Sequence, residues 1–400
     1  MISYHQAREL VVSRLLALQH QPQTESIPLA SCLARILAQD ILADRDYPPF
    51  DRSIRDGYAV RSADTLSGAT LRCTGELKAG DTPTASVQPG TCIQIMTGAA
   101  LPLGADAVIM IEHTQCSADA VTLDRAVGPG QHVVARGSEQ SSGKLVLAKS
   151  TRLGFAQIGV AAQVGAAQVT VYRKPRIAIL STGDEVVDLT SAPGPFQIRN
   201  SNSVSLAAQV ATLHAEPVLL GNAKDTYDDL RARISTGLES DALILSGGVS
   251  AGKYDLVEPV LKEFGAEFIF DAVAIRPGKP VVFAMCEGKP VFGLPGNPVS
   301  TMVTFDLFVR PAIDLLSGAP ATGLPFVEAV VTQRLSEKPG LTHFLPAAVE
   351  YGQAPRVTPL VWQGSGDVVA MSRANCLLVV PPDRENIEPG ERVQVLPRGL

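Results

Sequence analysis

The sequence predicts a multidomain α/β plus β protein, organised around a central, doubly wound and mostly parallel α/β domain. Its 400 residues exceed one ordinary hydrophobic core, so two to four domains are expected. Between residues 173 and 320, short apolar runs alternate with helical segments, which is typical of parallel strands covered on both faces. Residues 46–145 and 325–400 instead carry short β-prone runs rich in glycine and proline, as small β domains do.

The N-terminal segment, residues 1–45, reads as helical, because Ile2, Leu10, Leu15 and Leu18 are spaced among polar residues as on a surface helix. Residues 151–166 also look helical, and we expect them to return and pack on the first helix. That return would make the early β domain an insertion. The expected division is a helical N-terminal domain of residues 1–45 and 146–172, an inserted β domain of 46–145, an α/β domain of 173–320 and a C-terminal β domain of 325–400.

The elements of the α/β domain can be placed one by one. Strands are expected at 176–180, 216–221, 241–246, 266–275, 279–285 and 289–294, and helices at 201–214, 225–239, 254–265 and 298–318. In the C-terminal β domain the clearest strands are 326–335, 376–383 and 391–397.

Composition narrows the class of protein. With 46% hydrophobic and 18% charged residues, the chain is typical of a folded, soluble protein, and no apolar run is long enough to span a membrane. The N-terminus does not resemble a signal peptide, and six scattered cysteines without a CxxC pair favour reduced thiols in the cytoplasm. The net charge of −6 and the lack of a basic stripe argue against nucleic acid, while a locally positive pocket for a small anion stays open.

Four polar loops follow predicted strands of the α/β domain. Ligands of doubly wound sheets bind outside the carboxyl ends of the strands, so we expect these loops to converge on one edge. The loops are "STGDE" at 181–185, "SGGVSAGKYD" at 246–255, "RPGKP" at 276–280 and "PGNPVS" at 295–300.

The chemistry of these loops points to a Mg²⁺-pyrophosphate site. Glycines let backbone N–H groups approach phosphate oxygens, and Arg276 and Lys279 add positive charge. Carboxylates at the same edge need a cation between them and a phosphate, and Mg²⁺ is the usual solution. These carboxylates are Asp184, Glu185, Asp225 and Asp255.

Plainer interpretations apply to each loop taken alone. A Gly-Ser loop after a strand is often an ordinary turn, and Asp255 or Asn297 could cap the helix that follows it. Pro295 and Pro298 could simply shape a turn. The combination of four loops with charges of both signs favours a binding site.

The stretch 246–255 also matches two catalytic motifs. It fits GxxxxGK, but Tyr254 stands where a P-loop needs Ser or Thr for Mg²⁺. It fits GxSxG around Ser250, although the only later histidine, His343, lies in the C-terminal β region and no HGGG-type loop is present. A serine hydrolase stays as a weaker alternative.

A second group of polar loops lies in the early β domain. Alone, each would be an ordinary turn, but together they suggest loops that face a ligand. Their charged and polar residues are Asp51, Asp56, Thr97, Asp106, Arg136 and Glu139.

Taken together, these motifs resemble those of a known family. "DGYAV", "IMTGAALPLGADAVI", "LSTGDE", "SGGVSAGKYD", "IRPGKP" and "GLPGNPVS" occur in the order and spacing of the molybdopterin molybdenumtransferases, which include the E domain of gephyrin. The resemblance runs from about residue 2 to 397. "GLPGNPVS" together with "SGGVS…D" is its most specific part.

The resemblance implies a reaction and an assembly. Members of this family insert molybdenum from molybdate into adenylylated molybdopterin and release AMP, with Mg²⁺, as elongated homodimers of four domains per chain. The molybdopterin adenylyltransferase would be a partner. Because the two groups of polar loops would otherwise each be half a site, we expect the cleft to join the α/β domain of one chain to the early β domain of the other.

Individual residues carry over from the family's motifs. The resemblance implies catalytic roles for Asp56, Glu185, Asp255 and Lys279, substrate contacts for Thr97, Ser246, Gly247, Gly248, Ser250, Arg276, Pro295, Asn297, Pro298 and Ser365, and metal binding by Glu185, Asp225 and Asp255.

The chain also departs from the family pattern. Ile54 and Arg55 precede Asp56 where Met is usual, and Arg276 replaces a common lysine. Gly137–Glu139 replaces a Gly-Glu-Asp. The usual "GRxxFxR" of the last domain reads "GLTHFLP" at 340–346, without either arginine. These losses favour a second hypothesis, a non-catalytic pterin-binding or scaffold protein, whereas Asp56, Glu185, Asp255 and Lys279 favour the enzyme.

Overall fold

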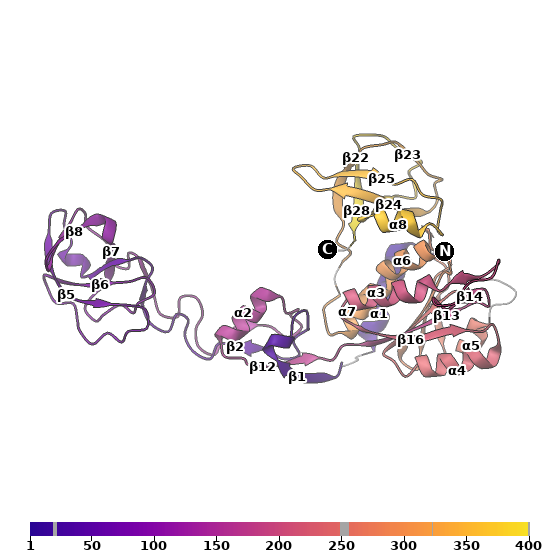
Figure 1. The fold of residues 1–400 in the computed structure, drawn as a ribbon, viewed down its shortest axis with the longest axis horizontal. Coiled ribbons are helices and arrows are strands. Elements are labelled where there is room, and N and C mark those ends of the chain that lie inside the picture. Colours follow the sequence, from indigo (N-terminus) through magenta and orange to yellow (C-terminus); the bar gives the residue numbers. More distant parts are fainter. Residues whose placement is uncertain (19–21, 249–255, 322, 399–400) are drawn as a thin grey trace.

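The computed structural model describes residues 1–18, 22–248, 256–321 and 323–398, and shows an elongated chain with a body at one end and a long arm (Figure 1). The body contains the α/β domain and the C-terminal β domain, and both ends of the chain lie in it. The arm runs through a small module around α2 and ends in a separate β sheet. Within the described residues, no helix is long and apolar enough to cross a membrane.

The core of the body is a six-stranded sheet in which all strands except β20 run in the same direction. This confirms the doubly wound, mostly parallel fold. In spatial order the strands are β16 (Glu216–Ala223), β13 (Arg176–Thr182), β17 (Ala242–Ser246), β21 (Lys289–Leu294), β20 (Val282–Cys286) and β18 (Glu267–Phe270).

Helices cover both faces of this sheet. Ile177 and Ile179 of β13 pack on one face, and Ala178 and Leu180 pack on the other. Because side chains alternate along a strand, burial on both sides requires the near-continuous apolar sequence seen here. The first face carries α1 (Tyr4–Ala17), α3 (Ser201–Thr212), α6 (Pro298–Thr304), a π-helical segment (Phe305–Val309) and α7 (Arg310–Leu316), and the second carries α4 (Tyr227–Gly237) and α5 (Val257–Glu263).

The expected packing of residues 151–166 on the N-terminal helix is wrong. Tyr4, Ala7, Val11 and Leu15 form one buried stripe that joins the core of the α/β domain, and α1 lies against α7. The helix α2 (Phe155–Gln163) packs instead in a separate small core around Leu37. Residues 151–166 therefore do not pack on the first helix.

The helical prediction for residues 1–45 also fails beyond α1. Pro28 has no N–H for a helix, and the segment pairs as short strands with residues far along the chain. β1 (Thr24–Pro28) is antiparallel to β12 (Gln168–Tyr172), and β2 (Ile41–Leu42) is antiparallel to β11 (Leu145–Leu147). The chain thus enters and leaves the arm through paired strands.

The end of the arm is a six-stranded sheet with its own core, which includes Tyr58, Val60 and Ile109. A two-stranded ribbon of β3 (Arg52–Ser53) and β10 (Val133–Val134) adjoins it. In spatial order the sheet contains β7 (Ala107–Met110), β4 (Gly57–Val60), β6 (Thr91–Ile95), β5 (Thr70–Leu77), β9 (Ala120–Leu123) and β8 (Thr114–Ser117).

The C-terminal domain is a small barrel, because β24 pairs with both β25 and β26 and so closes the sheet. The helix α8 (Val368–Arg373) lies beside it, and β23 (Leu335–Ser336) pairs with β27 (Asn386–Ile387). The strands of the ring are β24 (Thr342–Glu350), β25 (Arg356–Pro359), β22 (Val327–Val331), β28 (Arg392–Pro397) and β26 (Cys376–Val380).

The barrel also takes a strand from the α/β domain. β19 (Ile275–Arg276) runs parallel to β24, with Arg276 opposite His343. The expected strand at 266–275 is therefore divided between β18 in the central sheet and β19 on the barrel. This pairing holds the loop 276–280 between the two domains.

Candidate functional site

A cavity of about 590 Å³ opens at the carboxyl ends of β13, β17 and β21. Residues from all four predicted loops line it, which confirms that these loops meet at one edge of the sheet. The lining includes Thr182, Gly183, Glu185, Ser246, Gly247, Gly248, Pro280, Pro295, Gly296, Asn297 and Pro298.

Two glycines set the shape of the loop after β17. Gly247 and Gly248 have φ values of +92° and +63°. A Cβ on Gly247 would lie 2.9 Å from the Thr182 carbonyl oxygen, and one on Gly248 would lie 2.8 Å from the Thr182 Oγ1. Both the backbone conformation and the close packing therefore exclude side chains. The sequence Ser-Gly-Gly is what allows this loop to rest on the loop after β13.

Asn202 fixes the loops from β17 and β21 against each other. Its Nδ2 donates to Ser246 Oγ at 2.9 Å and to the Gly296 carbonyl at 2.8 Å. Asn200 caps α3 by accepting from the Ser203 N–H at 3.0 Å. Sequence analysis missed both asparagines. The cap could have been found from Asn directly before a helical pattern, whereas the partners of Asn202 are distant in sequence.

At one side of the cavity, the charges of two neighbouring carboxylates act on Asp225. Burial raises the pKa of Asp225, and the negative charges of Asp184 and Glu185 raise it further, although a backbone hydrogen bond opposes them. The Asp225 N–H donates to Asp184 Oδ1 at 3.2 Å. A bound cation would relieve this repulsion, because opposite charge favours the ionised carboxylate.

The predicted metal ligands are only partly brought together. Glu185 and Asp225 both line the cavity, whereas Ser250 and Asp255 lie outside the described residues. Among the residues that the structure describes, no cluster of three or more His, Cys, Asp or Glu side chains is arranged to hold a metal ion.

The two predicted cations lie away from the lining of this cavity. Lys279 lines the adjoining hollow, which shares Pro280 with the first. Arg276 is exposed and its Nη1 lies 3.6 Å from Glu337 Oε2 of the C-terminal domain. The pairing of β19 with β24 explains this position, because it carries Arg276 toward the barrel.

The loop after β21 leads directly into α6. Pro298 occupies the first turn of the helix, and the Asn297 side chain makes no capping hydrogen bond there. The Ser365 carbonyl of the C-terminal domain accepts from the Val299 N–H at 2.9 Å. Ser365 is therefore placed beside this corner of the cavity through its backbone.

Asp56 and Thr97 form a second polar site at the end of the arm. Asp56 Oδ1 accepts from the Thr97 N–H at 2.7 Å and from its hydroxyl at 2.8 Å, and these bonds lower the pKa of Asp56. Both residues are exposed. Asp56 directly precedes β4 and Thr97 follows β6, and Figure 1 shows β6 at the end of the arm, far from β13, whose carboxyl end opens on the cavity.

Three protein families match successive parts of the chain and define its class. Residues 2–165 match the MoeA N-terminal region (domain I and II), residues 178–315 match a probable molybdopterin binding domain, and residues 328–397 match the MoeA C-terminal region (domain IV). Together they define a protein of the MoeA architecture. The cavity lies in the segment that matches the molybdopterin binding domain.

The full-length relatives then identify the family: the chain belongs to the molybdopterin molybdenumtransferases. It is 34% identical over 398 residues to the molybdopterin molybdenumtransferase of Bacillus subtilis, which covers 96% of this chain and 92% of the relative. It is 35% identical over 413 residues to that of a Nostoc species, covering 99% and 94%. A molybdopterin biosynthesis MoeA protein structure from Pyrococcus horikoshii matches with a TM-score of 0.85 at 28% identity, over 99% of both chains.

Proposed function

We propose that the protein is a molybdenum insertase, which transfers molybdenum from molybdate to adenylylated molybdopterin and releases AMP. The observation that carries this proposal is the cavity at the strand ends of the domain that matches a molybdopterin-binding model. Its glycine loop can offer backbone N–H groups to phosphate oxygens, and its carboxylates can hold a cation between themselves and the phosphate. The substrate's adenylyltransferase would act one step earlier, and free cysteines at all six positions support a reaction in the cytoplasm.

The residues of the cavity bind and orient the substrate. The Ser246–Gly248 loop and Asn202 line the cavity, and we expect them to hold phosphate and pterin groups. Lys279 adds positive charge from the adjoining hollow, and Arg276 does so from the seam with the barrel. Catalysis then consists of positioning and electrostatic stabilisation, with no covalent bond to the enzyme.

We propose that carboxylate oxygens of this cavity hold Mg²⁺. Glu185 and Asp225 offer carboxylate oxygens at the cavity wall, and a cation there would offset the burial and the neighbouring negative charges that raise the pKa of Asp225. Asp255 is proposed as a further ligand from the motif alone. When bound, Mg²⁺ would stabilise the negative charge that develops on the departing AMP phosphate.

The second half of the site comes from a second chain. Asp56 and Thr97 are presented at the end of an arm that keeps them far from the cavity of their own chain. In a homodimer the arm of one chain reaches the cavity of its partner. Asp56, with its lowered pKa, is ionised there and helps to orient molybdate or a cation.

AMP release distinguishes this enzyme from a scaffold that binds the pterin without turnover. The absent arginines at Leu341 and Pro346 are the observation that favours the scaffold. We expect purified protein with adenylylated molybdopterin, Mg²⁺ and molybdate to release AMP over many turnovers. Binding of the substrate without AMP release above the protein-free background would establish the scaffold instead.

Replacing Asp225 by asparagine should stabilise the free protein at neutral pH. Folding raises the pKa of Asp225, so the ionised carboxylate lowers the free energy of unfolding at pH values above its usual pKa. At pH values below the usual pKa the side chain is protonated and this loss of stability is absent. We expect Asp225→Asn to raise the unfolding temperature by about 1–2 °C at pH 7 and to leave it unchanged near pH 3. Differential scanning fluorimetry measures both values.

Mg²⁺ provides the second part of this test. It should raise the unfolding temperature of the unmodified protein more than that of Asp225→Asn, because the variant offers one carboxylate fewer. Glu239→Gln, an exposed change on the same domain, is the control. Equal responses to Mg²⁺ in all three proteins would contradict metal binding at Asp225.

A further inference from the structure

The cavity has one positive side chain that the motifs do not indicate. Among the described residues that line it, Glu185 and Asp225 are acidic and Arg199 alone is basic. The proposed substrate brings phosphate groups into the same space. Of the described residues in the lining, Arg199 is therefore the one cationic neighbour of an anion in this cavity, since Lys279 and Arg276 lie elsewhere.

Arg199 belongs to a short strand at the edge of the cavity. β15 (Ile198–Arg199) pairs with β14 (Val186–Val187), and the Arg199 Nε donates to the Leu189 carbonyl at 3.1 Å. Of the ion pairs formed within the described part of the chain, none involves Arg199. Within the described residues its two terminal amino groups have no hydrogen-bond or ion-pair partner, so they remain for a ligand.

The start of α3 adds to the positive potential at this corner. Ser201 and Asn202 are its first two residues and both line the cavity beside Arg199. The N–H groups of a helix's first turn lack partners within the helix and carry partial positive charge. A phosphate at this point would meet a full charge and a helix terminus together.

We propose that Arg199 binds a phosphate of the adenylylated substrate, through the forked hydrogen bonds that a guanidinium makes with phosphate oxygens. This assignment rests on the proposed function and names a binding residue for it. Among the described residues that line the cavity Arg199 is the one cation, so it would bind the anion, while Glu185 and Asp225 would serve the metal ion. Its contribution is to affinity for the substrate, with little effect on the chemical step.

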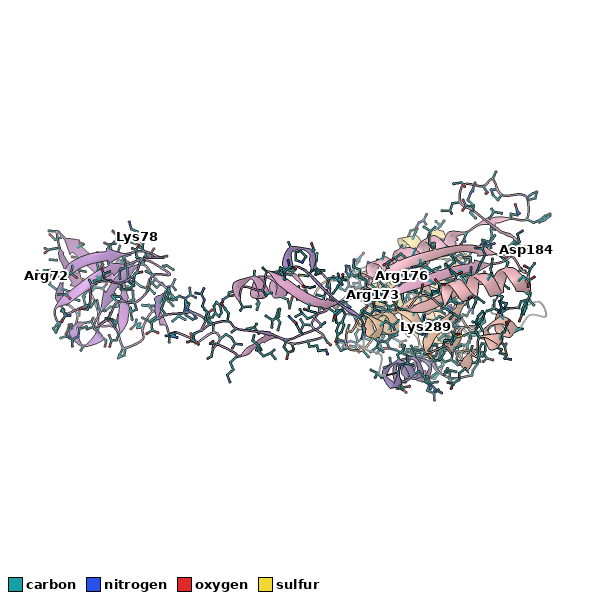
Figure 2. The ribbon with its side chains drawn as sticks, turned by 90° about the horizontal axis from the view of Figure 1, so that it is seen from below. Arg72, Lys78, Arg173, Arg176, Asp184 and Lys289 are labelled. Atoms are coloured by element: carbon teal, nitrogen blue, oxygen red, sulfur yellow. The ribbon has the colours of Figure 1, made fainter. Side chains whose placement is uncertain are left out.

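The test is a comparison of substrate affinity in matched variants. In Arg199→Gln we expect KM for adenylylated molybdopterin to rise about 10- to 100-fold, as for losing a hydrogen bond to a charged group, while kcat stays within a few-fold. Arg199→Lys should recover part of the affinity, because it keeps the charge but loses the fork. Arg176→Gln is the control, since Arg176 begins β13 and Figure 2 shows it at the opposite end of the domain from Asp184.

A second readout does not depend on turnover. Titration of the pterin substrate without molybdate and Mg²⁺, followed by pterin fluorescence, should show the same weakening in Arg199→Gln. If Arg199→Gln leaves both KM and the pterin titration unchanged while the unmodified protein turns over normally, the assigned role of Arg199 is wrong. The proposed function is not affected by that result. Failure of the unmodified protein to bind the substrate or release AMP would overturn the proposed function, and this assignment with it.

Discussion

Replacing Glu185 by glutamine should reduce AMP release by about 10²–10³-fold, the scale for removing one preorganised electrostatic contact. Glu185 lines the cavity directly after β13, and its charge adds to the raised pKa of Asp225. The amide keeps the shape of the side chain but removes the negative charge that would hold the cation. Rates measured under saturating substrate and Mg²⁺ isolate this effect from binding.

The control for this change is Glu216→Gln. Glu216 starts β16 at the other edge of the sheet, where it lies 3.7 Å from Arg176. Glu216→Gln should leave the rate of AMP release unchanged.

Ser250→Ala should reduce the rate of AMP release less than Glu185→Gln does, because water can partly replace a hydroxyl contact. If Ser250→Ala abolished turnover while Glu185→Gln stayed near the unmodified rate, Ser250 would be a nucleophile and the electrostatic account would be wrong.

Mixing two inactive variants should restore activity. Asp56→Ala removes the polar site on the arm, and Glu185→Ala damages the cavity, so each homodimer should be inactive. In a mixed dimer, the intact arm of one chain meets the intact cavity of the other and forms one good site. After random exchange of equal amounts, about a quarter of all sites should be functional. The measurement is AMP release before and after subunit exchange.

The two homodimers incubated separately under the same conditions give the baseline. Native mass measurement of the mixture shows whether mixed dimers have formed. If mixed dimers are present and the rate stays at the baseline, the arm does not complete its partner's cavity. Asp56 and Thr97 would then need a different role.

The alternation of apolar strands and helices predicted the central domain because its strands are buried on both faces. Ile177 and Ala178 are neighbours in sequence and face opposite layers of core, so the pattern is visible locally. The module at the base of the arm could not be predicted in this way. β1 has only its pairing with β12, more than 100 residues away, to define it as a strand.

The candidate site was predictable where it follows long strands. Glu185, Gly247 and Asn297 each follow a clear strand, and the carboxyl ends of parallel strands bring them together. Arg199 was missed because β15 has only two residues and gives no periodic signal, and Asn202 was missed because its partners, Ser246 and Gly296, are distant in sequence. The position of Arg276 was missed because β19 pairs with the barrel, a contact between domains that local pattern does not contain.

The most direct test of the central claim is to measure released AMP and pterin-bound molybdenum in the same single-turnover reaction. If the protein is an insertase, both should appear together, one AMP for each molybdenum bound, and both should depend on molybdate. Equal AMP release with and without molybdate, leaving a pterin that contains no metal, would contradict the account and show a simple hydrolase of the adenylylated pterin.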